Sequence, residues 1–173
     1  MAFRRMVRNL GVTACAVAMA VSVAGPALAA SQCLTRAQYD AERAIRYHNE
    51  LMVVALTCQT RMPEKSLFSG YKAFTSRHQT TLRSWEKVLT SWLGSQSAFD
   101  DFRTRIANEA AKRAALQTPE QFCIANSGMI PLAMQVEGAS LATYISSQPL
   151  AVASSRPLCD GEPAADPTVQ ASR

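Results

Sequence analysis

Apolar and small residues recur at steps of three and four along four stretches of the chain, residues 35–58, 71–92, 99–114 and 122–145. This spacing is typical of amphipathic helices that bury one face. No stretch sustains the period-two alternation of a half-buried β-strand. The pattern therefore predicts an all-α protein with four helical segments, of which the last is the least regular.

Polar residues mark the starts of three of these segments. Thr35 with Gln38, and Thr118 with Gln121, have the spacing of a capping box, in which two side chains satisfy backbone N–H groups of the first turn. Ser97 precedes the third stretch and is expected to be its N-cap. The predicted helices therefore begin where the apolar pattern begins.

Helix-breaking residues separate the stretches. Pro63 follows the first stretch and Gly94 the second, while Gly128, Pro131 and Gly138 fall inside the fourth. Because proline removes a backbone donor and glycine favours turns, we expect the last helix to be broken into two pieces. Helices joined by short loops favour antiparallel neighbours, so the expected fold is an antiparallel four-helix bundle.

The N-terminal segment has the layout of a secretory signal peptide. Arg4, Arg5 and Arg8 precede an apolar run at residues 10–23, and residues 27–30 read Ala-Leu-Ala-Ala, an A-x-A cleavage pattern. The apolar run is short for a membrane span, which favours a cleaved signal over a retained anchor. We therefore expect a periplasmic or secreted protein with no stable membrane insertion after cleavage.

Three regions follow from these features. We assign residues 1–30 to the signal peptide and residues 31–148 to one helical bundle domain. Residues 149–173 are rich in proline, alanine and serine, and are expected to form a mostly disordered tail tethered at Cys159.

Four cysteines remain after the signal: Cys33, Cys58, Cys123 and Cys159. An even set in an exported protein is typical of structural disulfides, and neither a Cys-x-x-Cys motif nor zinc-ligand spacing is present. Cys33 and Cys58 bracket the first helix and lie about 37 Å apart, too far to bond. In an up-down-up-down bundle the pairs Cys58–Cys123 and Cys33–Cys159 meet at opposite ends, and we predict this nested pairing.

The charge of the chain gives no indication of a nucleic-acid partner. The formal net charge is +5, but three of the positive charges belong to the signal, which holds no acidic residue, so the rest of the chain carries +2. Basic residues do gather in residues 61–87. An anion-binding face is one interpretation of this segment, and a solvated helix surface is the one we favour.

His48, His78 and Glu109 fall near the apolar faces of three predicted helices. Together they would offer a polar or metal-binding cluster inside the bundle. The Glu-x-x-His motif of di-metal bundles is absent, however, and histidines at helix seams usually hydrogen-bond to a neighbour. We therefore predict no metal and no cofactor.

No motif in the sequence indicates catalysis. A Gly-x-Ser-x-Gly elbow and a P-loop are both absent. The even cysteine set leaves no free thiol for nucleophilic chemistry, and a helix N-terminus explains the carboxylate pair Asp100-Asp101. We predict that the protein is not an enzyme.

The run at residues 47–58, Tyr-His-Asn-Glu-Leu-Met-Val-Val-Ala-Leu-Thr-Cys, resembles small exported proteobacterial proteins of unknown function. The pair Asn108-Glu109 and the Phe-Cys pair that ends at Cys123 fit the same family. The resemblance implies that Cys58 and Cys123 belong together and that Asn108-Glu109 has a structural or site role, but it implies no activity. The candidate polar cluster then comprises His48, His78, Asn108 and Glu109.

A weaker likeness concerns residues 34–38, Leu-Thr-Arg-Ala-Gln, which match the L-T-x-x-Q motif of periplasmic chaperones of the Spy and CpxP kind. Residues 118–121 match this motif only in part, and both segments are also ordinary capping boxes. The favoured function is a non-enzymatic interaction or chaperone-like role with an unknown protein partner. The alternative is a small-ligand or metal-binding bundle that uses the candidate polar cluster. The first predicts an exposed apolar patch, and the second predicts a pocket lined by His48, His78 and Glu109.

Overall fold

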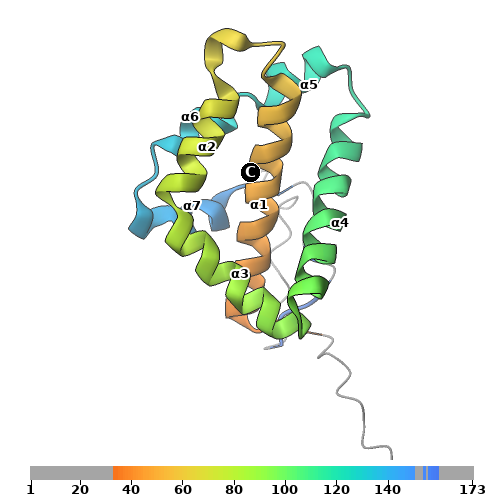
Figure 1. Ribbon diagram of the computed structural model, residues 1–173, viewed down its shortest axis with the longest axis vertical. Helices are drawn as coiled ribbons and strands as arrows, with labels where there is room; N and C mark the ends of the chain where they lie inside the picture. Colours follow the sequence, from red (N-terminus) through yellow and green to blue (C-terminus); the bar gives the residue numbers. More distant parts are fainter. Residues whose placement is uncertain (1–32, 151–153, 155, 160–173) are drawn as a thin grey trace, which may run out of the picture.

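The computed structural model describes residues 33–150, 154 and 156–159 (Figure 1). The predicted signal peptide at residues 1–30 and residues 160–173 of the predicted tail lie outside this part of the chain. The described residues are mainly helical and form one isolated β-bridge, so the all-α class is confirmed. In chain order the helices are α1 (Arg36–Cys58), η1 (Pro63–Lys65), α2 (Leu67–Arg77), α3 (Gln79–Leu93), α4 (Gln96–Ala114), α5 (Pro119–Asn126), α6 (Met129–Met134), η2 (Gly138–Ser140) and α7 (Leu141–Ser147).

Two of the predicted helix starts are confirmed. The Thr35 hydroxyl accepts a hydrogen bond from the backbone N–H of Gln38 at 3.3 Å, and the Gln38 side chain accepts one from the backbone N–H of Thr35 at 2.9 Å. Thr118 and Gln121 form the same reciprocal pair at the start of α5. Both capping boxes therefore satisfy first-turn N–H groups that the helix itself leaves unpaired.

The prediction of Ser97 as the third helix start is wrong. The N-cap of α4 is Ser95, whose hydroxyl accepts a hydrogen bond from the backbone N–H of Ala98 at 3.1 Å. The preceding Gly94 has a φ of 88°, a left-handed conformation that glycine adopts without steric cost. This tight turn brings Ser95 to the helix start and leaves Ser97 inside the first turn of α4.

The second and fourth predicted helices differ from the observed ones. The second is divided into α2 and α3 at His78, whose φ and ψ of −100° and 13° are not helical. No glycine or proline lies near His78, so no local pattern predicted this break. The fourth is broken, as predicted, but into three short helices, α5, α6 and α7, rather than two.

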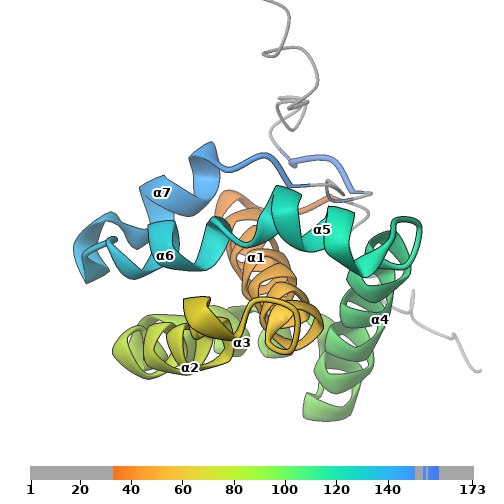
Figure 2. The ribbon, with the colours of Figure 1, turned by 90° about the horizontal axis from the view of Figure 1, so that it is seen from above.

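Helix α1 lies at the centre of the structure and contacts α2, α3, α4, α5, α6 and α7. Seen from above, α5, α6 and α7 lie in a row on one side of α1, while α2 and α3 lie on another (Figure 2). A row of short helices thus replaces the single fourth helix, and the regular antiparallel bundle stays a prediction. The larger core cluster joins α1 to α2 and to this row, and a second cluster between α1, α3 and α4 contains Ile45, Leu89, Phe99, Phe102 and Ile106.

Both predicted disulfides are confirmed. Cys58 at the end of α1 bonds Cys123 of α5, with their Cα atoms 5.5 Å apart. Cys33, just before α1, bonds Cys159, with their Cα atoms 4.8 Å apart. Beside the second bond, Leu34 pairs with Leu158 in a parallel β-bridge, and both side chains are buried. The described end of the chain is thereby held against the start of α1.

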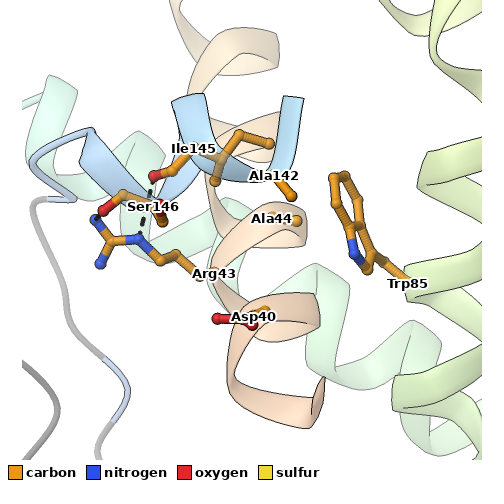
Figure 3. Close-up of a pocket in the computed structure, with 7 residues that line it drawn as sticks. All are labelled: Asp40, Arg43, Ala44, Trp85, Ala142, Ile145 and Ser146. Atoms are coloured by element: carbon orange, nitrogen blue, oxygen red, sulfur yellow. Dashed lines mark hydrogen bonds between the residues drawn. The ribbon is translucent and has the colours of Figure 1, made fainter. Parts of the chain in front are cut away.

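Arg43 of α1 binds the C-terminal end of α7. Its guanidinium donates hydrogen bonds to the backbone oxygens of Ile145 at 3.2 Å and Ser146 at 3.0 Å (Figure 3). It also donates to the backbone oxygen of Gln148. These carbonyls lie at the negative end of the helix dipole, where the last C=O groups of a helix lack their usual partner four residues on; that of Ile145 also accepts the backbone N–H of Gln148 at 3.1 Å. The cavity beside Arg43 in Figure 3 measures about 10 Å³, enough for one water molecule.

We expect the Cys58–Cys123 bond to contribute about 4 kcal/mol to the free energy of unfolding, because it closes a loop of 65 residues in the unfolded chain. A double Cys58→Ala and Cys123→Ala variant should lose about this amount in urea unfolding under non-reducing conditions. An unchanged unfolding midpoint would show that the bond does not constrain the fold.

We expect Arg43→Met to lower the free energy of unfolding by about 2 kcal/mol, because its charged hydrogen bonds to α7 are lost. Amide hydrogen exchange should accelerate within residues 141–148 in particular. Arg83→Met, at an exposed position of α3, is the matched control and should leave both measurements unchanged. Equal effects of the two substitutions would contradict this role for Arg43.

Candidate functional site

The candidate polar cluster is divided between different parts of the structure. His48 lies on the side of α1 that meets α2, where its Nε2 is 2.9 Å from the Thr75 hydroxyl and its ring stacks on that of Tyr71, with centroids 5.3 Å apart. Burial lowers the pKa of His48 to about 4, and the positive charge of Arg103 contributes in the same direction. The neutral imidazole is therefore the form that the fold accommodates.

His78 lies at the break between α2 and α3, with only 2% of its surface exposed. Its ring centroid is 4.7 Å from that of Phe74, and the same phenyl ring lies 6.4 Å from the His48 ring. The two histidines thus contact one shared aromatic side chain. Burial lowers the pKa of His78, and the Arg77 charge adds to this effect.

Glu109 belongs to a separate network on another face of α1. Its Oε2 lies 3.1 Å from Nη1 of Arg46, whose Nε donates to the buried Glu42 carboxylate at 2.8 Å. The second oxygen of Glu42 accepts a hydrogen bond from the Ser154 hydroxyl at 2.9 Å. Since Arg46 and His48 are two positions apart on a helix, they point to nearly opposite sides. This network joins α1, α4 and the chain after α7.

Asn108 is exposed on α4, next to Glu109 but outside this network. The structure therefore does not gather His48, His78 and Glu109 around one pocket. Within the described part of the chain, no group of three or more histidine, cysteine and carboxylate side chains is placed to hold a metal ion.

The basic segment at residues 61–87 spans η1, α2 and much of α3. Two of its cations contact the row of short helices: the Lys65 amine donates to the Ser127 hydroxyl at 2.9 Å, and Arg77 donates to the backbone oxygen of Met134. Lys72 lies 5.2 Å from the centre of the Phe68 ring. These three cations thus make contacts within the fold, and the choice between an anion-binding face and a solvated helix surface stays a prediction.

Sequence reasoning missed a groove between α1 and α4. It has a volume of about 220 Å³ and is lined by Asn49, Met52, Asp100, Arg103, Thr104 and Ala107, which we call the α1–α4 groove. The four α4 residues follow the spacing of one helix face, but this spacing alone could not say which face of α1 would lie opposite. The groove therefore depends on how the two helices pack.

A second surface feature is the outer side of α5, α6 and α7. Within α5, α6 and α7 the one charged residue is Glu120, in the first turn of α5, and the sequence from 121 to 150 adds only Glu137, whereas each of α1, α2, α3 and α4 carries two or more charges. Ile124 of α5 is 68% exposed and Leu132 of α6 is 56% exposed. We call the exposed residues of α5, α6 and α7 the charge-poor face.

No family model, curated protein or solved structure matches this chain. The two resemblances drawn from the sequence stay predictions. Among the described residues, no helix is both long enough and apolar enough to cross a membrane.

We expect acid to destabilise the fold through His48. Because its folded-state pKa of about 4 lies below the ordinary value of 6.5, the unfolded chain binds the proton first as the pH falls. The contribution is complete above pH 6.5 and is lost between pH 6.5 and pH 4, by roughly 3 kcal/mol.

The measurement is the free energy of unfolding in urea at several pH values from 7.5 to 4. His48→Gln keeps a polar group near Thr75 but does not titrate, so its stability should fall less over this range than that of the wild type. His78 remains in both proteins and cancels in the comparison. Identical pH dependences would contradict the assignment to His48.

Proposed function

We propose that the chain is an exported, non-enzymatic interaction protein that binds apolar segments of other polypeptides in the periplasm, in a chaperone-like role. Two disulfides support an oxidising compartment outside the cytoplasm. The signal-like pattern at residues 1–30 supports export by the secretory route.

The observation that carries this proposal is the charge-poor face. Charged residues are depleted at the centres of protein interfaces, and large exposed apolar side chains are typical of contact surfaces. Ile124 and Leu132 expose more than half of their surface although their neighbours Cys123 and Ala133 are fully buried. The helices of this row thus have an inner apolar side for the core and further apolar residues outside.

The composition of this face also indicates the kind of partner. Nucleic acids require cations against their phosphates, and anionic membrane surfaces attract clustered lysine and arginine. The sequence from 121 to 150 contains neither lysine nor arginine. An unfolded polypeptide with exposed apolar residues can bury them against Ile124 and Leu132, and the single charge of these three helices is Glu120, one turn before Ile124, which favours such a client.

The test uses a client that stays unfolded without reductant, because reductant would open the two disulfides of the protein itself. Reduced and carboxymethylated α-lactalbumin, labelled with a fluorophore, meets this need. We expect saturable binding in fluorescence anisotropy, and a loss of about tenfold or more in the affinity of a double Ile124→Asp and Leu132→Asp variant, because two large apolar contacts are replaced by charges.

The matched control is Leu116→Asp. Leu116 is 84% exposed in the connection between α4 and α5, where charged residues are near in sequence, so the same chemical change falls outside the charge-poor face. This variant should bind the client like the wild type. No binding by the wild type, or equal binding by the double variant, would refute the proposal.

A further inference from the structure

We propose that the α1–α4 groove binds a small zwitterion, namely a free α-amino acid with an apolar side chain. This site does not depend on the charge-poor face, because it is formed by α1 and α4 rather than by α5, α6 and α7. It also differs from the predicted site at His48, His78 and Glu109, none of which lines the groove.

The α4 wall of the groove carries one negative and one positive side chain, which are neighbours on the helix surface. Asp100 and Arg103 are three positions apart on α4, so they lie on the same face within about 6 Å at their Cβ atoms. A simple anion would be attracted by Arg103 and repelled by Asp100, and a simple cation would meet the reverse. An α-amino acid carries a carboxylate and an ammonium on adjacent atoms, and it satisfies both residues together.

The Arg103 guanidinium has N–H donors that are available to bind a ligand carboxylate. Its nearest carboxylate is that of Glu86, with Nη1 and Oε1 3.7 Å apart, compared with 2.8 Å for the pair between Arg46 and Glu42. About half of the Arg103 side chain is exposed. Since a guanidinium has five N–H donors in a planar fork, this loose pair leaves a bidentate position available.

The opposite wall supplies an acceptor for the ammonium. Asn49 of α1 is only 6% exposed, and its amide nitrogen donates to the backbone oxygen of Ile45 at 2.7 Å. This bond fixes the orientation of the amide, and its oxygen makes no hydrogen bond to the described residues. The Asn49 oxygen and the Asp100 carboxylate therefore provide two acceptors in one groove, and an ammonium group has three donors.

The remaining lining residues set the size and polarity of the ligand. Met52 and Ala107 provide apolar surface for an aliphatic side chain. The volume of about 220 Å³ is below the roughly 300–1,000 Å³ of sites for drug-sized ligands, and it suits a molecule of amino-acid size.

The experiment is a heteronuclear NMR titration of the full, disulfide-bonded chain with three probes of nearly the same shape. These are L-leucine, 4-methylpentanoate, which lacks the ammonium, and 3-methylbutylamine, which lacks the carboxylate. We expect saturable shifts in residues that line the groove for leucine, and an affinity about tenfold lower or worse for each singly charged analogue. Absence of saturable leucine binding, or an analogue that binds as tightly as leucine, overturns the proposal.

Four single variants locate the site. Arg103→Gln and Asp100→Asn should each weaken leucine binding by about tenfold, because each removes one charge that the ligand pairs with. Arg105→Gln and Asp101→Asn are matched controls: they are exposed on the same helix outside the groove, and Arg105, like Arg103, lies over a phenylalanine ring. The controls should bind leucine within about twofold of wild type, and equal losses in all four variants refute the assignment to this groove. If leucine does not bind but the unfolded client still does, the groove proposal fails while the proposed function stands.

Discussion

Both ends of α1 are held by disulfides to segments that follow them by 126 and 65 residues in the sequence. The first bond fixes the described end of the chain beside the start of α1, and the second fixes α5 beside its end. Helices α5, α6 and α7 have eight, six and seven residues, lengths at which an isolated helix is not stable in water. They are therefore stable only as a row packed along α1 between the two covalent anchors. Arg43 adds a third anchor to this row by binding the end of α7.

Side chains on different faces of α1 contact different helices. His48 faces the aromatic residues of α2, Arg46 faces Glu109 of α4, and Asn49 lines the α1–α4 groove. Leu51 and Val54 belong to the larger core cluster, which also contains buried residues of α5, α6 and α7. Polar contacts of α1 occur on both sides, because Arg43 binds the end of α7 and the Tyr47 hydroxyl lies 3.1 Å from that of Tyr144. The row exposes Ile124, Leu132 and one charged helix residue, Glu120. This surface, which we propose for polypeptides, is separate from the groove that we propose for a small ligand.

The sequence was most informative where the signal is local or covalent. The capping boxes at Thr35 and Thr118 could be predicted because each one involves only four consecutive residues in the first turn of a helix. A straight helix keeps Cys33 and Cys58 apart whatever surrounds it, which excludes one of the three possible disulfide pairings, and the expected antiparallel bundle favoured one of the other two. In contrast, the break at His78 could not be predicted from the residues around it. It lies where α2 and α3 each pack against α1. Ser95 was missed for a related reason: its role as N-cap depends on the turn at Gly94.

The candidate site shows the same division. Spacing correctly placed His48 and His78 near a core face, but it could not fix the rotation of α1 against α4, so Glu109 was assigned to the histidines although it pairs with Arg46. By itself the sequence determined that the chain is helical, where two of its helices start, that Cys33 and Cys58 do not pair with each other, and that residues 121–150 carry almost no charge. Only the tertiary structure decided which helix faces meet, and with them the α1–α4 groove and the exposure of Ile124 and Leu132. The physical reason is that helix periodicity is a property of neighbouring residues, whereas the relative rotation of two helices is set by packing between side chains far apart in the chain.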